Sequence, residues 1–138
     1  MTLLPTGERK LRMSNFILDA SAVLAFLNQE QGAEAVERLI PDSNINAVNL
    51  AEVLSRSVDL GHTDRSARKA FALLNLEVIE FDTQHAEKAA ELRLTTRHLG
   101  LSLGDRSCLA SAILHNATAV TADRIWKSLD VCPIEVIR

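Results

Sequence analysis

The feature that most constrains the fold of this chain is the alternation of short apolar segments with longer segments of helical periodicity. The apolar segments are too short for buried helices and suit strands that are buried on both faces. Strands that alternate with helices favour a parallel sheet with helices packed on both sides. The sequence therefore predicts a three-layer α/β/α domain, with strands at residues 15–18, 43–48, 77–81, 118–121 and 134–137.

The segments between these strands carry apolar residues at the spacing of helices. After the first strand, Val23, Leu24 and Leu27 share one helical face. Gly61 and Gly100 stand where two later helices are expected to end. The predicted helices are residues 21–30, 32–40, 49–61, 63–76, 83–100, 103–116 and 122–129.

Length and composition indicate a single domain. The chain has 138 residues, and no apolar run is long enough to span a membrane. Cys108 and Cys132 belong to no CxxC pattern, so neither a zinc site nor a disulfide framework is indicated, and a reduced, cytoplasmic protein is expected. Residues 1–14, MTLLPTGERKLRMS, lack the apolar core of a signal peptide. They are predicted to form an N-terminal extension, whose order the sequence leaves open, before a domain over residues 15–138.

The position of Asp19 raises the first question about function. It lies inside the apolar run FILDASAVLAFL, where a buried carboxylate is costly unless it is hydrogen-bonded, paired or bound to a metal. Three other acids have comparable places: Glu52 follows the second strand by one turn, Asp105 stands near the start of a helix, and Asp123 follows the fourth strand. Because parallel strands end at one edge of the sheet, we expect the four carboxylates to converge.

Four converging carboxylates repel one another, so they must take up protons or bind a cation. Oxygen ligands without a neighbouring His or Cys favour Mg²⁺ or Mn²⁺ over zinc. A second interpretation is that the three aspartates are helix N-caps and that Glu52 forms a capping box with Asn49. The two interpretations are compatible, because a carboxylate can cap a helix with one oxygen and bind a metal with the other.

The segments around the acids resemble those of a known family. ILDASAVLAFL, NLAEVLSR, LSLGDRSCLASAI and AVTADRIW, in this order, are similar to the four acidic motifs of PIN domains. The resemblance is closest to VapC-type toxins of bacterial toxin–antitoxin modules. It extends from residue 15 to residue 138, and none of the four acids is missing.

The resemblance implies a central parallel five-stranded sheet in the order 3-2-1-4-5. It also implies a metal-dependent endoribonuclease that cleaves structured RNA, such as tRNA or rRNA, as the toxin of a type II toxin–antitoxin system. The implied cofactor is Mg²⁺ or Mn²⁺, and the implied partners are a VapB-like antitoxin and a second copy of the chain. The implied catalytic and metal-binding residues are Asp19, Glu52, Asp105 and Asp123, with the hydroxyl groups of Ser21 and Thr121 beside them.

Two arginines are the predicted RNA contacts closest to the acids. Arg106 and Arg124 directly follow Asp105 and Asp123, so they could bind phosphate groups or pair with the acids when no metal is bound. Trp126 is expected to pack in the protein interior, because five aromatic residues are too few for a base-stacking platform. The histidines show no metal-ligand spacing; they are His62, His85, His98 and His115.

Three other functions compete with the toxin interpretation. A haloacid dehalogenase-like phosphotransferase would use Asp19 as its nucleophile, but it needs a second Asp two residues later, where this chain has Ser21. A PIN nuclease of RNA processing, outside any toxin–antitoxin module, would carry the same acids. A PIN-like binding module without turnover is the third alternative, although the complete set of acids argues against it. The sequence does not identify the RNA target or the antitoxin.

Overall fold

The computed structural model describes residues 14–138, so almost all of the predicted N-terminal extension lies outside the described residues. Six α-helices and five strands form the described part, and they alternate largely as the sequence predicts. The strands are β1 (Phe16–Leu18), β2 (Ser43–Asn46), β3 (Glu77–Ile79), β4 (Thr118–Thr121) and β5 (Ile134–Val136). The α-helices are α1 (Ala20–Leu27), α2 (Ala33–Leu39), α3 (Ala47–Asp59), α4 (Asp64–Ala72), α5 (Thr83–Thr96) and α6 (Leu103–Leu114).

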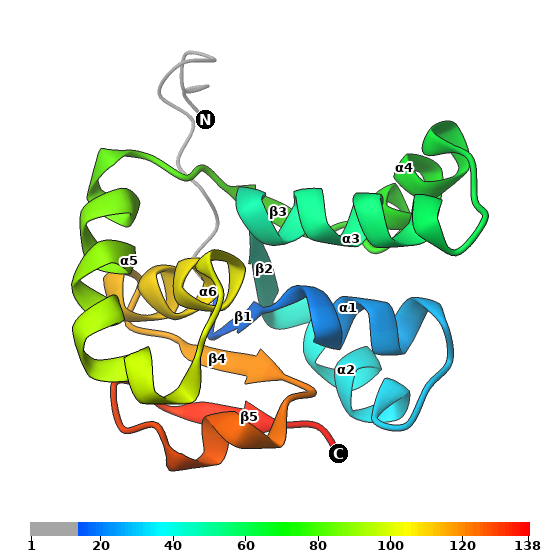
Figure 1. The fold of residues 1–138 in the computed structure, drawn as a ribbon. Helices are drawn as coiled ribbons and strands as arrows, with labels where there is room; N and C mark the ends of the chain where they lie inside the picture. The colour runs from blue at the N-terminus through cyan, green and yellow to red at the C-terminus, as the bar shows by residue number, and fades with distance from the viewer. Residues whose placement is uncertain (1–13) are drawn as a thin grey trace, which may run out of the picture.

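All neighbouring strands of the sheet are parallel, and their order is β3-β2-β1-β4-β5. This result confirms the predicted strand order. Leu18, at the end of β1, pairs in register with Ile45 of β2 on one side and with Val120 of β4 on the other. The three central strands therefore end side by side, at the edge from which α1 and α3 start (Figure 1).

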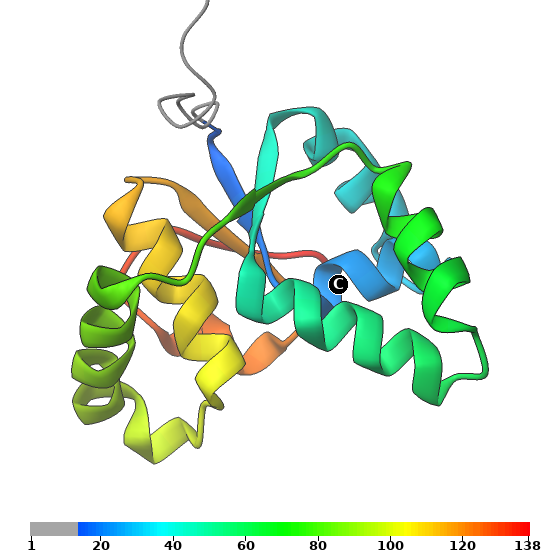
Figure 2. The same cartoon turned by 90° about the horizontal axis from the view of Figure 1, so that it is seen from above.

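Two apolar cores lie on opposite faces of the sheet. Alternate strand residues divide between them: Ile17 and Ala119 pack under α5 and α6, whereas Leu18 and Val120 pack under α1 and α2. Figure 2 shows α5 and α6 on one side of the strands and α1 to α4 on the other. The three-layer α/β/α architecture is therefore as predicted, and both faces of the central strands are buried.

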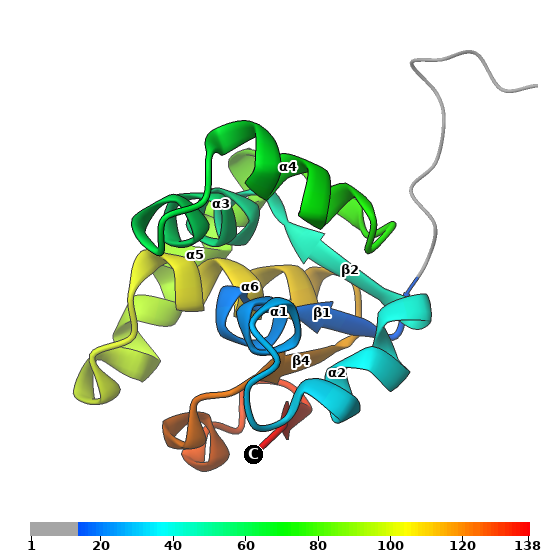
Figure 3. The ribbon, with the colours of Figure 1, turned by 90° about the vertical axis from the view of Figure 1, so that its right-hand side faces the viewer.

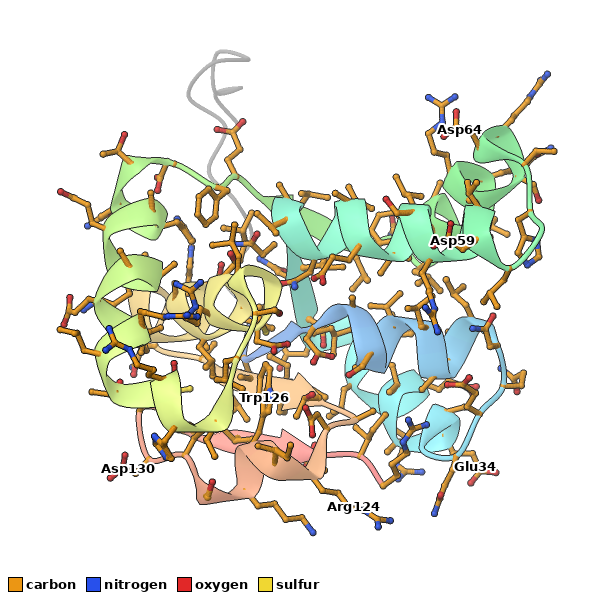
Figure 4. The ribbon with its side chains drawn as sticks, viewed as in Figure 1. Glu34, Asp59, Asp64, Arg124, Trp126 and Asp130 are labelled. Carbon is orange, nitrogen blue, oxygen red and sulfur yellow. The ribbon has the colours of Figure 1, made fainter. Side chains whose placement is uncertain are left out.

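Two local predictions differ from the structure. The segment predicted as the last helix, residues 122–129, contains the 3-10 helix η4 (Arg124–Ser128) instead. The side chain of Trp126, a residue of η4, is fully buried in the core beneath α5 and α6, as expected for a packing role (Figure 4). The second strand ends at Asn46 instead of residue 48, because the Asn46 side chain accepts a hydrogen bond from the Val48 amide and caps α3.

A chain of buried polar side chains joins α5, α6 and β2. His85 Nδ1 lies 2.7 Å from Asp82 Oδ1, and this contact lowers the pKa of the Asp82 carboxyl. His85 Nε2 lies 3.0 Å from the hydroxyl of Ser111, which accepts a 2.7 Å hydrogen bond from the Asn46 amide group. Ser111 is fully buried, so these contacts fasten the helix layer to the sheet.

Two other helices sit at the same end of the sheet as α1. Figure 3 looks onto this end and shows α1 in front of β1, with α3 and α6 beside it. The α3 helix contacts both α1 and α6. Within residues 14–138, none of the helices has the length and apolar character needed to cross a membrane.

We expect replacement of Ser111 by Ala to lower the free energy of unfolding by about 1–3 kcal/mol, because Asn46 and His85 would lose a buried partner. Urea unfolding of the purified protein measures this loss. Ser66→Ala is the matched control, since Ser66 is exposed on α4, and its effect should stay within about 0.5 kcal/mol. Equal effects of the two substitutions would show that the buried network adds no stability.

Candidate active site

The four acids singled out by the sequence line one cavity of about 430 Å³ at the carboxyl ends of the central strands. The convergence of these acids was the central expectation from their positions, three of them after strands and Asp105 near the start of a helix. The cavity also takes in residues of α1 and α3 that do not belong to the four acids. Its lining residues are Asp19, Ala20, Ser21, Leu24, Asn49, Glu52, Ser55, Arg56, Asp59, Asp105 and Asp123.

Asp19 is the most deeply placed of the acids, with only 4% of its surface exposed. It follows β1 directly and caps α1, since its Oδ1 accepts a 2.8 Å hydrogen bond from the Ala22 amide. Burial, with a smaller contribution from the charge of Asp105, raises the pKa of its carboxyl to about 6, although three hydrogen bonds oppose this rise. A cation that bound to this carboxylate would therefore compete with a proton.

The hydroxyl groups of Ser21 and Thr121 bind the two oxygens of Asp19. Ser21 donates to Oδ1 over 2.7 Å, and Thr121 donates to Oδ2 over 2.6 Å. The same two hydroxyls accept hydrogen bonds from the backbone amides of Ala122 and Asp123. The two side chains thus fix the Asp19 carboxylate and tie the end of β1 to the end of β4.

Glu52 reaches the cavity from the second turn of α3, and it is solvent-exposed. Its Oε1 accepts a 2.9 Å hydrogen bond from Asn49, whose amide group also donates to the backbone oxygen of Gly104 over 3.0 Å. The predicted capping box of Glu52 with Asn49 is wrong, because Asn46 is the N-cap and Asn49 lies inside the helix.

Asp105 and Asp123 each use one oxygen for a helix end. Asp105 Oδ2 accepts from the Ser102 amide, and the Ser102 hydroxyl accepts from the Asp105 amide, which completes a capping box at the start of α6. Asp123 Oδ1 accepts from the Ile125 amide and caps η4. Capping and a place in the cavity therefore coexist in these two residues, since both also line the cavity.

Three lining residues of α3, Asn49, Ser55 and Asp59, were not predicted as part of a site. Asn49 was interpreted as a cap, and Arg56 and Asp59 stand one and two turns beyond Glu52 on the side of α3 that faces α1 (Asp59 is labelled in Figure 4). Their spacing from Glu52 could have shown this, because residues four and seven apart share a helical face. Asp59 gives the cavity a fifth carboxylate, and Arg56 is the one basic residue among the described residues that line it.

The cavity suits a hard divalent cation by its donor chemistry. Its carboxylates supply only oxygen ligands, and the pKa of Asp19 is raised mainly because burial disfavours its negative charge, which a bound cation would offset. Among residues 14–138, no three acidic, histidine or cysteine side chains are already gathered closely enough to hold an ion. A cation site here would therefore need some of these acids to come closer to Asp19, which its hydrogen bonds hold in place.

The two arginines predicted to contact RNA point in different directions. Arg106 turns away from the cavity: its Nη1 donates to the backbone oxygen of Ala89 on α5 over 2.9 Å. Arg124 lines an adjacent groove of about 550 Å³ that shares Ser21 and Asp123 with the acidic cavity. The exposed Arg124 side chain, labelled in Figure 4, is anchored by a 3.1 Å hydrogen bond from Nε to the backbone oxygen of Arg138.

The predicted structural roles of the histidines and cysteines agree with their positions. His85 belongs to the buried network of α5 and α6, and His115 lies against it with a ring separation of 6.1 Å. Cys108 and Cys132 are both free thiols. Burial raises the pKa of the Cys108 thiol well above its ordinary value, so it packs as an apolar group.

Comparison with known proteins agrees with this geometry. Residues 16–131 match the PIN domain family. A toxin–antitoxin complex from Klebsiella pneumoniae aligns with a TM-score of 0.71 and 20% identity, over 88% of this chain and 97% of that chain. VapBC2 from Rickettsia felis, bound to a DNA fragment from its promoter, aligns with a TM-score of 0.68 and 22% identity, over 87% and 96%. VapBC-5 from Mycobacterium tuberculosis aligns with a TM-score of 0.59 and 28% identity, over 90% and 98%.

A search of the curated proteins found no match to this chain. The assignment therefore depends on the family match, which spans most of the described residues, and on the sheet order and the position of the acids. On this combined evidence, the chain belongs to the PIN domain family.

Proposed function

We propose that this chain is a metal-dependent endoribonuclease and the toxin of a type II toxin–antitoxin module. The observation that carries the proposal is the convergence of four carboxylates, from four separate segments of a PIN domain, on one cavity. The similar solved structures include a toxin–antitoxin complex and two VapBC systems, and this likeness supports the toxin assignment.

The acids would hold one or two Mg²⁺ or Mn²⁺ ions. A bound cation would supply positive charge that admits an anionic phosphodiester and would make water a stronger nucleophile toward phosphorus. Asp19, Asp105 and Asp123 would be direct ligands, because each lines the cavity. Glu52 would either ligate or orient the attacking water from α3.

Ser21 and Thr121 would act through Asp19. Their hydroxyls donate to both of its oxygens, so they hold the carboxylate in one orientation and stabilise its charged form. A catalytic site needs its reacting groups held in place before substrate arrives, and these two bonds supply that order at the deepest acid. The more exposed acids would complete the site when a cation and RNA are bound.

Structured RNA, such as tRNA or rRNA, is the proposed substrate class. Its phosphates need basic contacts outside the acidic cavity, and Arg124, which lines the adjoining groove, would make one such contact. Arg56, which lines the cavity itself, would make another. We assign Arg106 no contact with RNA, because it bonds to α5 on the other side of α6.

The proposed partners are a VapB-like antitoxin and a second copy of this chain. The proposal follows from the family and from the toxin–antitoxin complexes among the similar structures. A phosphotransferase of the haloacid dehalogenase type is set aside, because the chain belongs to a different family and Ser21 stands where that chemistry needs an acid. A PIN nuclease of RNA processing remains the competing function.

The first prediction from this proposal concerns RNA cleavage. Purified protein with Mg²⁺ or Mn²⁺ should cut labelled total tRNA or ribosomal RNA into discrete fragments. EDTA should abolish the cutting, and so should Asp19→Asn, which retains the size and capping capacity of the side chain but removes its charge. The fragments are measured on denaturing gels, and circular dichroism establishes that the variant is folded.

Lys127→Gln is the control for a change of charge near the site, since Lys127 is exposed on η4 and lines neither the cavity nor the groove. It should cleave at the wild-type rate. Wild-type cleavage by Asp19→Asn, or undiminished cleavage in EDTA, would contradict the proposed chemistry.

The second prediction concerns pH in the absence of metal. The raised pKa of Asp19 means that the folded protein binds this proton more tightly than the unfolded chain does, so stability falls as the pH rises from about 4 through about 6. The rise from 3.8 to about 6 corresponds to about 3 kcal/mol. Asp19→Asn should therefore gain about 3 kcal/mol relative to wild type between pH 4 and pH 7.

Urea unfolding of both proteins in EDTA across this pH range measures the difference. Comparing the two proteins cancels the titration of the other carboxylates. A stability difference that does not change with pH would show that Asp19 titrates with an ordinary pKa.

The third prediction separates a toxin from an RNA-processing enzyme. Expression of the chain alone in a bacterial host should arrest growth, whereas expression of Asp19→Asn should not, because the arrest depends on cleavage. Colony counts after induction measure the effect, and immunoblots establish equal protein levels. Normal growth with an actively cleaving protein would favour the RNA-processing function.

A further inference from the structure

The side chain of Asn49 is buried and donates two hydrogen bonds, one to Glu52 and one to Gly104, which lies next to the Glu52 carboxylate. Only 1% of its surface is exposed, although it lies on a helix that borders a cavity. Its side-chain nitrogen donates to Glu52 Oε1 over 2.9 Å and to the backbone oxygen of Gly104 over 3.0 Å. The same side chain thus links the acid on α3 to the first turn of α6.

Gly104 supplies the space in which the Glu52 carboxylate lies. A Cβ atom at position 104 would stand 2.6 Å from both Cδ and Oε2 of Glu52, far inside van der Waals contact. Gly104 itself is buried and does not have the positive φ that favours glycine. Its backbone conformation therefore does not require glycine, and what the missing side chain provides is room for the acid.

We propose that Asn49 and Gly104 are positioning residues for Glu52, which together hold its carboxylate against the first turn of α6 beside Asp105. This inference rests on the proposed metal site. It explains how Glu52, the one predicted acid on α3, is held in position. Glutamate has several rotatable bonds and Glu52 is exposed, so without a partner its carboxylate would sample many positions. The donated hydrogen bond and the shaped space remove that freedom before a cation binds.

A purely structural role for the two residues predicts a different pattern of effects. Alanine forms helices better than glycine, and the group that a methyl group at position 104 would displace is the far end of the exposed Glu52 side chain, which can rotate away. Gly104→Ala should therefore leave the fold at least as stable as before. If Gly104 instead served the packing of α3 against α6, the same substitution would destabilise the protein.

The test measures Mn²⁺ binding by calorimetry and thermal unfolding of the metal-free protein, for wild type, Gly104→Ala and Asn49→Ala. We expect Gly104→Ala to keep or raise the unfolding temperature while its Kd for Mn²⁺ rises roughly 10- to 100-fold. Asn49→Ala should weaken Mn²⁺ binding to a similar extent. Ser57→Ala is its control, because Ser57 is a buried polar residue of α3 that does not line the cavity, and its Kd should equal that of wild type.

The same measurements in a Glu52→Gln background show whether the effect passes through Glu52. If it does, neither Gly104→Ala nor Asn49→Ala should weaken Mn²⁺ binding further once the charge of Glu52 is gone. An undiminished effect of either substitution in that background would overturn the inference. So would a wild-type Kd in Gly104→Ala when Glu52→Gln alone weakens binding. Wild-type binding by Glu52→Gln alone would instead show that the proposed metal role of Glu52 is wrong, and the inference would fall with it.

Discussion

The hydrogen bonds to the Asp19 carboxylate are the interaction on which the rest of the structure depends. They bring together the end of β1, the first turn of α1 and the end of β4, and one buried charge is enough to join all three. Removing such a charge from water is costly, and the bonds from Thr121, Ala22 and Ser21 offset only part of the cost. The remainder is what makes this position receptive to a proton or a cation.

The pattern of apolar segments was sufficient to predict the layers of the fold, because strands that are buried on both faces are short, continuous apolar runs. The strand order could be predicted only from the resemblance to a family, since the residues of a strand do not determine which strands lie beside it in the sheet. Boundaries were less predictable: Asn46 caps α3 and so ends β2 early, and a capping side chain at the end of a strand looks like part of that strand. The short segment after Asp123 became a 3-10 helix, which its five residues could not reveal.

The candidate site was predictable where a residue's position along the chain determines its place in space. Acids that follow parallel strands lie at one edge, so Asp19, Glu52 and Asp123 line one cavity as predicted, and Asp105 joins them from the first turn of α6. Contacts between separate helices were not predictable in this way. Arg106 follows an acid directly, yet it bonds to α5, because neighbouring residues on a helix point in different directions. The contact of Asn49 with Gly104 likewise depends on how α3 packs on α6.

The double use of the aspartates has a consequence for how such a chain can change over generations. Asp19 and Asp123 cap helices with one oxygen, and asparagine caps a helix equally well. Aspartate and asparagine codons differ by a single nucleotide transition. One base change can therefore remove the charge at either position while the side chain still accepts the hydrogen bond that caps the helix. A population under selection against this protein thus has a short mutational route to a folded variant that lacks this charge.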